Sequence, residues 1–304
     1  MSRLWVMTSA EQLGYFGPDS LTWRVHADPT LWVGGIRALY LQALHPGAMA
    51  GVSRHSGFRT DPWGRLFRTA EYVGTITFGT RSAAERAAGR VRGLHHRLGI
   101  DDPDLLRWVH CCEIDSFLTV ARRAGLRLTG ADADRYVAEQ VRAAELVGIP
   151  AADAPASEAE LRAQIGSYRP ALAGGPQARE AARFVLMPPM PAGALAALAA
   201  RPAWAGVAGL AFCLLPGWAR RMYRLPGLPS TDLAASVAVR GLRAALLALP
   251  PRLREGPQYQ QATRRLAAAG SAPAGSTPVG SPPQTPASPA SPVSPNGSAR
   301  RAPA

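Results

Sequence analysis

The sequence contains no lysine, so all 34 of its basic residues are arginines, against 21 acidic residues in 304. Arginine and lysine differ chemically, but no binding site requires arginine alone over a whole chain. We therefore attribute the imbalance to a genome rich in G and C. The formal charge of +13 is then weak evidence for a nucleic-acid partner. Lysine runs and a recognisable nucleic-acid module are absent too, so we expect no such partner.

Cysteine is scarce, with Cys111, Cys112 and Cys213 as the three in the chain. An odd number with two adjacent members excludes a disulfide framework, and no C-x-x-C or C-x-x-H spacing suggests zinc. A reducing compartment is the simpler interpretation. The first residues also lack the apolar run of a signal peptide. We therefore expect a cytoplasmic protein.

Long apolar runs are lacking as well. The weakly charged region 184–219 is the nearest approach, but Arg201 and five prolines interrupt it. A spanning helix needs about 20 apolar residues. The pattern favours buried helices here, and a peripheral membrane contact remains open as an alternative.

Alternating strand patterns are nearly absent, and Thr75 to Phe78, the best strand candidate, continues a helical stripe. The periodicity predicts an all-α protein, with one multi-helix domain over residues 1–268. Residues 269–304 hold no aromatic side chain and are rich in Pro, Ser and Ala, which predicts a disordered tail.

Cap residues and periodicity locate the helices of the predicted domain. Asp61-Pro62 and Asp102-Pro103 each open a helix, and the pair Ser82 and Glu85 forms a capping box that opens another. The other predicted helices cover residues 31–50 (ending near His45), 132–147, 157–166 and 176–186, with two or three more between 192 and 249.

All six histidines lie between His26 and His110, so any acid–base or metal chemistry is expected in the first half of the chain. His95 falls within the apolar stripe of the helix that starts near Ser82, whereas His96 falls outside it. His95 should therefore point inward and His96 toward solvent. A hydrogen-bonded core histidine is the alternative interpretation of His95.

The helix that begins at Pro62 places Arg65, Arg68, Thr69 and Tyr72 on one face. The ordinary interpretation is a solvated face. The opposite side is apolar too, however, so the helix has little obvious solvent side.

A third group of polar residues lies in the helix that follows Pro103. His110 and Glu113 share a face with Phe117, and Asp115 follows nearby. A buried polar network that pairs two helices is the more ordinary interpretation of these residues, and catalysis is the alternative.

Several motifs occur together in a characteristic order. They are Phe16-Gly17-Pro18-Asp19-Ser20 with Trp23-Arg24-Val25-His26, Leu41-Gln42-Ala43-Leu44-His45-Pro46, Arg59-Thr60-Asp61-Pro62 with Gly64-Arg65-Leu66-Phe67-Arg68-Thr69, Arg90-Val91-Arg92-Gly93-Leu94-His95, and Trp108-Val109-His110 with Asp115-Ser116. In this order they resemble the oxygenase MpaB family, which includes the rubber oxygenases, or latex clearing proteins. The resemblance covers roughly residues 15–228.

The resemblance implies an all-helical, haem-binding domain in which haem b lies between helices. It implies that His95 is the axial ligand of the iron. The residues after His95 depart from the family pattern, which leaves His96 as a rival ligand. The resemblance also places Arg65, Arg68 and Thr69 on the distal, catalytic side, with Arg68 where the family has lysine.

Further residues are candidates for contact with the cofactor. His45 and His110 are candidate pocket-wall residues or second ligands. Arg65, Arg68, Arg37 or Arg59 could supply the cations that the haem propionates need.

Two functions from different classes follow. The first is a haem-dependent oxygenase, an oxidoreductase that acts with dioxygen on an apolar, isoprenoid-like substrate, by cleavage of a carbon–carbon double bond. The second is a non-catalytic, membrane-associated helical protein that binds a lipid or a partner. A haem spectrum separates the two.

Overall fold

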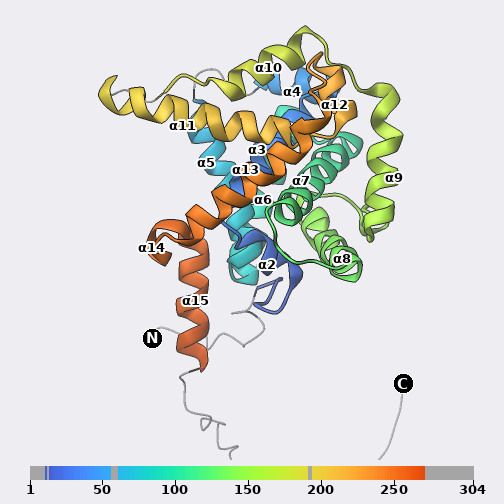
Figure 1. The fold of residues 1–304 in the computed structure, drawn as a ribbon. Helices are drawn as coiled ribbons and strands as arrows, with labels where there is room; N and C mark the ends of the chain where they lie inside the picture. The colour runs from blue at the N-terminus through green and yellow to red at the C-terminus, as the bar shows by residue number, and fades with distance from the viewer. Residues whose placement is uncertain (1–10, 12–13, 56–60, 191–193, 271–304) are drawn as a thin grey trace, which may run out of the picture.

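The computed structural model describes residue 11 and residues 14–55, 61–190 and 194–270 (Figure 1). Within these residues the chain forms helices and no strand, so the prediction of an all-α protein is confirmed. Thr75 to Phe78 belong to a helix. Arg59 and the predicted tail from residue 271 onward lie outside the described residues.

The helices follow one another with short connections. In chain order they are α2 (Leu21–His26), α3 (Leu31–Gln42), α4 (Pro46–His55), α5 (Pro62–Phe78), α6 (Arg81–Leu98), α7 (Pro103–Arg123), α8 (Gly130–Val147), α9 (Glu158–Tyr168), α10 (Pro176–Leu186), α11 (Ala194–Cys213), α12 (Gly217–Met222), α13 (Pro229–Leu247), α14 (Pro251–Arg254) and α15 (Pro257–Gly270), with two 3-10 turns at Ala151–Asp153 and Arg169–Ala171.

Helices α3 and α7 form the centre of the molecule, and α10, α11 and α13 cover one side of them (Figure 1). Fully buried side chains such as Tyr40, Leu44 and Trp108 fill this core. The two central helices approach closely at Gly34, where an added Cβ would lie 2.9 Å from Cδ1 of Phe117 and 3.3 Å from the backbone oxygen of Ser116. The glycine is therefore required by the crossing itself.

A buried guanidinium ties the same two helices together. Arg37 on α3 donates to Oδ2 of Asp115 at 2.8 Å and to the Ser116 hydroxyl at 2.7 Å, both on α7. It also donates to the backbone oxygen of Leu214, at the end of α11, at 3.0 Å. Three segments that are distant in sequence are thus held by one side chain.

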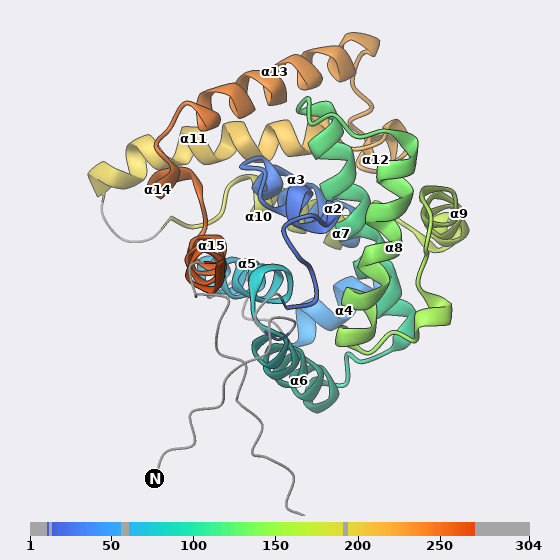
Figure 2. The ribbon, with the colours of Figure 1, turned by 90° about the horizontal axis from the view of Figure 1, so that it is seen from below.

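Helices α5 and α6 form an antiparallel pair, and α6 lies at the opposite side of the molecule from α11 and α13 (Figure 2). The pair is joined to the body through α2 and α8, and the first turn of α5 also reaches α11, where the rings of Trp63 and Trp204 lie 4.7 Å apart. Helix α15 packs on α5, where Tyr259 lies against the edge-to-face pair of Trp23 and Phe78.

The helix starts that the aspartates predict are confirmed. Oδ1 of Asp61 accepts from the Gly64 amide at 2.9 Å, and Oδ1 of Asp102 accepts from the Asp104 amide at 2.9 Å. In each case proline follows the cap, where its missing N–H costs nothing.

Two boundaries differ from the prediction. Residues 31–50 are not one helix, because the chain turns at Ala43 and starts α4 at Pro46. Helix α6 is capped by Thr80, whose hydroxyl accepts from the Ala83 amide at 3.2 Å. Ser82 therefore lies inside the first turn, and Glu85 instead accepts from the Tyr15 hydroxyl at 2.5 Å.

The main helix of the region 184–219 is α11, which contains Pro202 and buries Ala208 and Ala211 in the core. No described helix is both long enough and apolar enough to cross a membrane.

The close crossing at Gly34 leads to a stability prediction. Gly34→Leu would force α3 and α7 apart, and we expect it to lower the free energy of unfolding by about 1–3 kcal/mol. Gly35→Leu is the matched control, since an added Cβ at Gly35 meets no atom within 4 Å. Urea denaturation of both variants measures the difference in their free energies of unfolding. Equal denaturation midpoints would contradict a close approach of α3 and α7 at Gly34.

Candidate active site

The two adjacent histidines of α6 have different surroundings. The helix ends at Gly99, whose φ of 60° closes the last turn by letting the Ile100 amide reach the His95 carbonyl at 3.0 Å. The ring of His95 is partly buried, burial lowers its pKa, and its Nδ1 is buried without a hydrogen-bond partner in the described part of the chain. The side chain of His96 is 84% exposed and pairs with Asp101 at 2.8 Å. This geometry favours His95 over His96 as an inward ligand.

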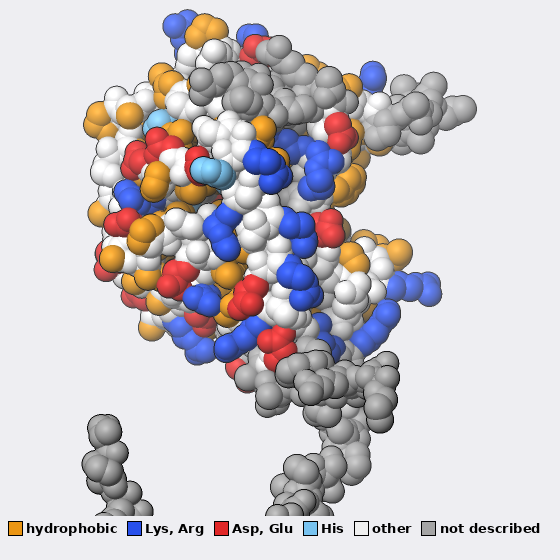
Figure 3. All heavy atoms as spheres, turned by 180° about the vertical axis from the view of Figure 1, so that it is seen from behind, with side chains coloured by type: hydrophobic (Ala, Val, Ile, Leu, Met, Phe, Trp, Pro, Cys, Tyr) orange, Lys and Arg blue, Asp and Glu red, His pale blue; other side chains and the backbone are white. Residues whose placement is uncertain are grey.

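The outer face of α6 is solvated. Seen from behind (Figure 3), the molecule shows a band of arginine side chains with acidic side chains among them, on the side where α6 lies outermost in Figure 2. Arg86, Arg90 and Arg97 are exposed members of this helix. The mixed charge of the band agrees with a face in water, so His95 lies on the inner side of a helix whose other side is wet.

The arginine-rich face of α5 is divided. Arg65 is partly buried, and burial lowers its pKa, but no acidic side chain among the described residues pairs with it. Arg68 is 67% exposed and binds the Asp61 carboxylate at 3.1 Å. Thr69 is exposed, and its hydroxyl donates to the Arg65 backbone oxygen at 3.1 Å. The structure thus brings Arg65 inward, whereas Arg68 and Thr69 lie on a solvent side that the sequence pattern did not reveal.

Helix α7 contributes a buried histidine and a partly buried carboxyl. His110 is buried, its pKa is lowered to about 4 by burial, and its Nε2 has no hydrogen-bond partner among the described residues. Burial raises the pKa of Glu113, one turn further on, to about 7. In the described chain no side chain or backbone group hydrogen-bonds to this carboxylate. Unlike Asp115, Glu113 does not belong to a helix-pairing network.

Two tyrosines share the surroundings of Glu113. Burial raises the pKa of Tyr72 on α5 and of Tyr136 on α8, and the charge of Glu113 raises both further. Tyr136 also bonds to the buried His26, with its hydroxyl 3.1 Å from Nε2, while Thr77 lies 2.7 Å from Nδ1 of the same ring. Sequence reasoning missed Tyr136, since one tyrosine in an amphipathic helix carries no signal of its own.

Two other candidates have structural partners. His45 is partly buried, and its Nδ1 accepts from the Gly47 amide at 3.1 Å, at the first turn of α4. Its ring packs beside Trp108 and Tyr168. Arg37 is committed to Asp115 and to its other partners, as described above. Neither is free in the way that Arg65 is.

The described residues contain no group of three or more His, Cys, Asp or Glu side chains that could hold a metal ion by themselves. The interior instead offers single, separated groups: an inward histidine on α6, a buried histidine and a carboxyl on α7, and a cation on α5. Such an arrangement can bind an anion, accept or donate a proton near neutral pH, and supply one imidazole ligand.

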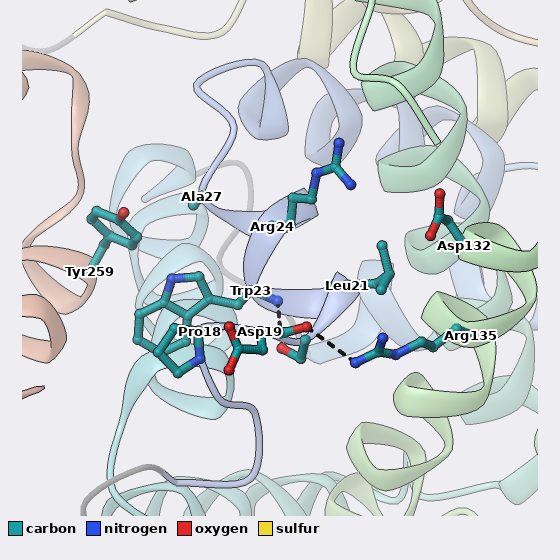
Figure 4. Close-up of a pocket in the computed structure, with 10 residues that line it drawn as sticks. Pro18, Asp19, Leu21, Trp23, Arg24, Ala27, Asp132, Arg135 and Tyr259 are labelled. Carbon is teal, nitrogen blue, oxygen red and sulfur yellow. Dashed lines mark hydrogen bonds between the residues drawn. The ribbon is translucent and has the colours of Figure 1, made fainter. Parts of the chain in front are cut away.

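A surface hollow of about 640 Å³ lies elsewhere, between α2, α8 and α15. Figure 4 shows Trp23 and Tyr259 at one side of it and Asp132 and Arg135 at the other, with Arg135 reaching the backbone oxygen of Asp19 at 3.1 Å. No histidine lines it. It is therefore separate from the histidines of α6 and α7.

The candidate residues thus lie on α5, α6 and α7 of an all-α domain. Residues 23–249 match the family model described as "ER-bound oxygenase mpaB/B'/Rubber oxygenase, catalytic domain". The match covers most of the chain, which therefore belongs to this family of oxygenases. No significant match was found among curated proteins or solved structures. The matched region ends after α13, so α14 and α15 lie beyond it.

The raised pKa of Glu113 predicts a pH effect on stability. The folded protein keeps a proton on Glu113 up to about pH 7, whereas the unfolded chain releases it near the ordinary value of 4.5. The folded state therefore loses stability through this group as the pH rises between those two values. Glu113→Gln cannot ionise, so relative to the wild type it should gain up to about 3 kcal/mol between pH 5 and pH 8.

Urea denaturation at the two pH values measures that gain. Glu71→Gln, at an exposed position of α5, is the control and should follow the wild type. A Glu113→Gln variant whose stability also follows the wild type at both pH values would show that the carboxyl is solvated.

Proposed function

We propose that the protein is a haem-dependent oxygenase that acts with dioxygen on an apolar, isoprenoid-like substrate. Membership of the oxygenase family supports the reaction class. The observation that carries the proposal is the inward ring of His95, which has a buried and unpartnered nitrogen on a rigid helix. Buried polar groups in proteins nearly always have hydrogen-bond partners. The unpartnered nitrogen of His95 is therefore a candidate for contact with a bound ligand.

The residues present fit a haem. A haem would need an imidazole from the protein for its iron. His95 would supply it, and His110, whose Nε2 also has no partner among the described residues, is a second candidate. The macrocycle carries two propionates, and Arg65 is a desolvated cation without an acidic partner among the described residues. A charge-assisted bond to a propionate or another anion would compensate it.

Bound haem would supply the iron chemistry that activates dioxygen. The chain's own groups have three roles in this proposal. Arg65 donates hydrogen bonds to an anionic group. Glu113 holds or releases a proton at its carboxyl oxygens near neutral pH, beside the hydroxyls of Tyr72 and Tyr136. Apolar side chains that include Ile76 and Phe117 keep water out.

Cleavage of a carbon–carbon double bond is the reaction that we infer for an isoprenoid-like substrate. Each carbon of the broken bond receives one oxygen atom of the dioxygen molecule, which gives two carbonyl groups. No external reductant is consumed in this balance. Such a substrate has no polar group to recognise, so apolar walls would have to bind it by burial.

The role of Arg65 can be tested against that of Arg68. Arg65→Gln removes a desolvated cation, and we expect it to weaken haem binding about tenfold or more, because the anion that it holds loses its partner. Arg68→Gln changes an exposed guanidinium on the same helix and should bind haem as the wild type does. Titration of each protein with haemin, followed by absorbance, gives the two affinities. Equal affinities would remove Arg65 from the cofactor site.

The histidine ligand is tested by the same spectrum. The wild-type protein reconstituted with haemin should show a Soret band, which His95→Ala abolishes or shifts because the axial ligand is lost. His96→Ala, one residue away on the exposed side, is the matched control and should keep the wild-type band.

Two outcomes contradict the proposal in different ways. A wild-type protein without a Soret band would favour the non-catalytic, lipid- or partner-binding alternative. A Soret band that changes in His96→Ala and not in His95→Ala would show that His96, and not His95, is the iron ligand.

A further inference from the structure

The charged side chains of helix α13 all have partners on neighbouring segments of the protein. Asp232 is held by both terminal nitrogens of the buried Arg220, each at 3.0 Å. Arg240 donates to the Arg123 backbone oxygen at 3.2 Å, and Arg243 binds the buried carboxylate of Asp28 at 2.6 Å. The orientation of α13 is therefore fixed by these polar contacts together with Ala235 and Val239, which are buried in the core.

The outward face of α13 is exposed and mostly apolar, with Arg240 as its charged residue. Leu233 is 70% exposed and Val237 60%, and Gly241, Ala244 and Ala248 continue the same face toward the C-terminal end. Helix α13 is the outermost layer on its side of the molecule, with α11 beneath it (Figures 1 and 2). The connection that leads into α13 adds Leu225 and Leu228, the latter 72% exposed. Exposed apolar side chains that gather in this way mark an interaction surface.

Arginines flank the apolar residues at the start of this face. Arg221 and Arg224 are exposed, and the one acidic residue between positions 221 and 241 is Asp232, which Arg220 already neutralises. Arg224 has a φ of 62° and is the one described residue other than glycine with a positive φ. This conformation costs about 1 kcal/mol or more for a side chain with a Cβ, yet arginine occupies it where glycine would be free of strain.

A hollow of about 490 Å³ lies directly beside these residues. Its lining is mostly apolar and includes Phe212, Leu225 and Leu228, with Arg224 among its polar members. It therefore combines an apolar wall with a guanidinium, as the boundary between lipid headgroups and acyl chains requires.

We propose that this surface docks on an anionic lipid bilayer. The surface, called the α13 strip, consists of Leu225, Leu228, Leu233 and Val237 with Arg221 and Arg224. The apolar side chains enter the interfacial layer and the arginines bind lipid phosphates. The contact is made by a helix lying on the membrane, and it moves the expected peripheral contact from residues 184–219 to α13.

A second copy of the chain fits the strip less well. A two-fold interface places the same residues of both copies together. Joining two α13 strips would bring four arginines into one interface, and the strip has no free carboxylate to neutralise them. Anionic headgroups neutralise them directly.

Vesicle co-sedimentation of the full-length protein tests the proposal. We expect binding to phosphatidylcholine vesicles that contain phosphatidylserine, and much weaker binding to phosphatidylcholine alone. Leu233→Asp/Val237→Asp should lower the apparent affinity about tenfold or more, because it puts two charges into the interfacial layer. Arg221→Gln/Arg224→Gln should lower it about tenfold or more and reduce its salt dependence, since each arginine near an anionic surface contributes about 1 kcal/mol.

Two control variants lie on the opposite side of the molecule. Leu94→Asp and Arg86→Gln/Arg90→Gln change exposed residues of α6 and should bind vesicles as the wild type does. All of the changed side chains are exposed, so circular dichroism should show unchanged helix content in every variant.

Three results would overturn the proposal. The first is no binding of the wild type to anionic vesicles, and the second is equal binding by the strip variants and the α6 variants. The third is a dimer, seen by sedimentation velocity without lipid, that Leu233→Asp/Val237→Asp dissociates, which would assign the strip to a second copy. None of the three bears on the haem spectrum, so the proposed oxygenase function stands or falls separately.

Discussion

The architecture depends on the buried ion pair between Arg37 and Asp115. A buried guanidinium is tolerated only if a carboxylate and further acceptors surround it, and here α3, α7 and the end of α11 supply them. The pair fixes the rotation of α7 about its own axis. Glu113, two residues before Asp115, must then project from a different side of the helix. One helix thus uses one carboxylate for packing and presents another, without a hydrogen bond from the described residues, to the interior beside α5 and α8.

Other polar groups, unlike the Arg37–Asp115 pair, have no hydrogen-bond partner among the described residues. Burying a polar group without a hydrogen bond costs stability, and the described chain leaves Nδ1 of His95 on α6, and Nε of Arg107 and Nε2 of His110 on α7, buried without one. Arg65 on α5 and Glu113 on α7 are partly buried, and burial shifts the pKa of each toward its neutral form.

Much of the fold could be predicted from the sequence because its signals are local. Asp61 and Asp102 cap the helices whose starts they predict, and the apolar stripe of α6 separates His95 from His96 correctly.

The errors concern features that tertiary contacts determine. From the sequence, Thr80 and Ser82 are equally good candidates for the N-cap of α6. The sequence also does not show that Arg68 forms an ion pair with Asp61 on the solvent side of α5. The partner of Arg37 lies 78 residues away, and the partner of Arg243 on α13 is Asp28, near the start of the chain. For the site, the sequence supplied the residue types and the family resemblance, but it could not tell which side chains would be left without partners.

The central claim is that His95 provides the axial ligand of a haem iron inside this helical domain. Resonance Raman spectroscopy of the reduced, haem-reconstituted protein tests it most directly, because an iron–histidine stretching mode reports the bond itself. The account predicts that this mode is present in the wild type, absent in His95→Ala, and replaced by an iron–imidazole mode when imidazole is added to that variant. A mode that persists unchanged in His95→Ala would contradict the account.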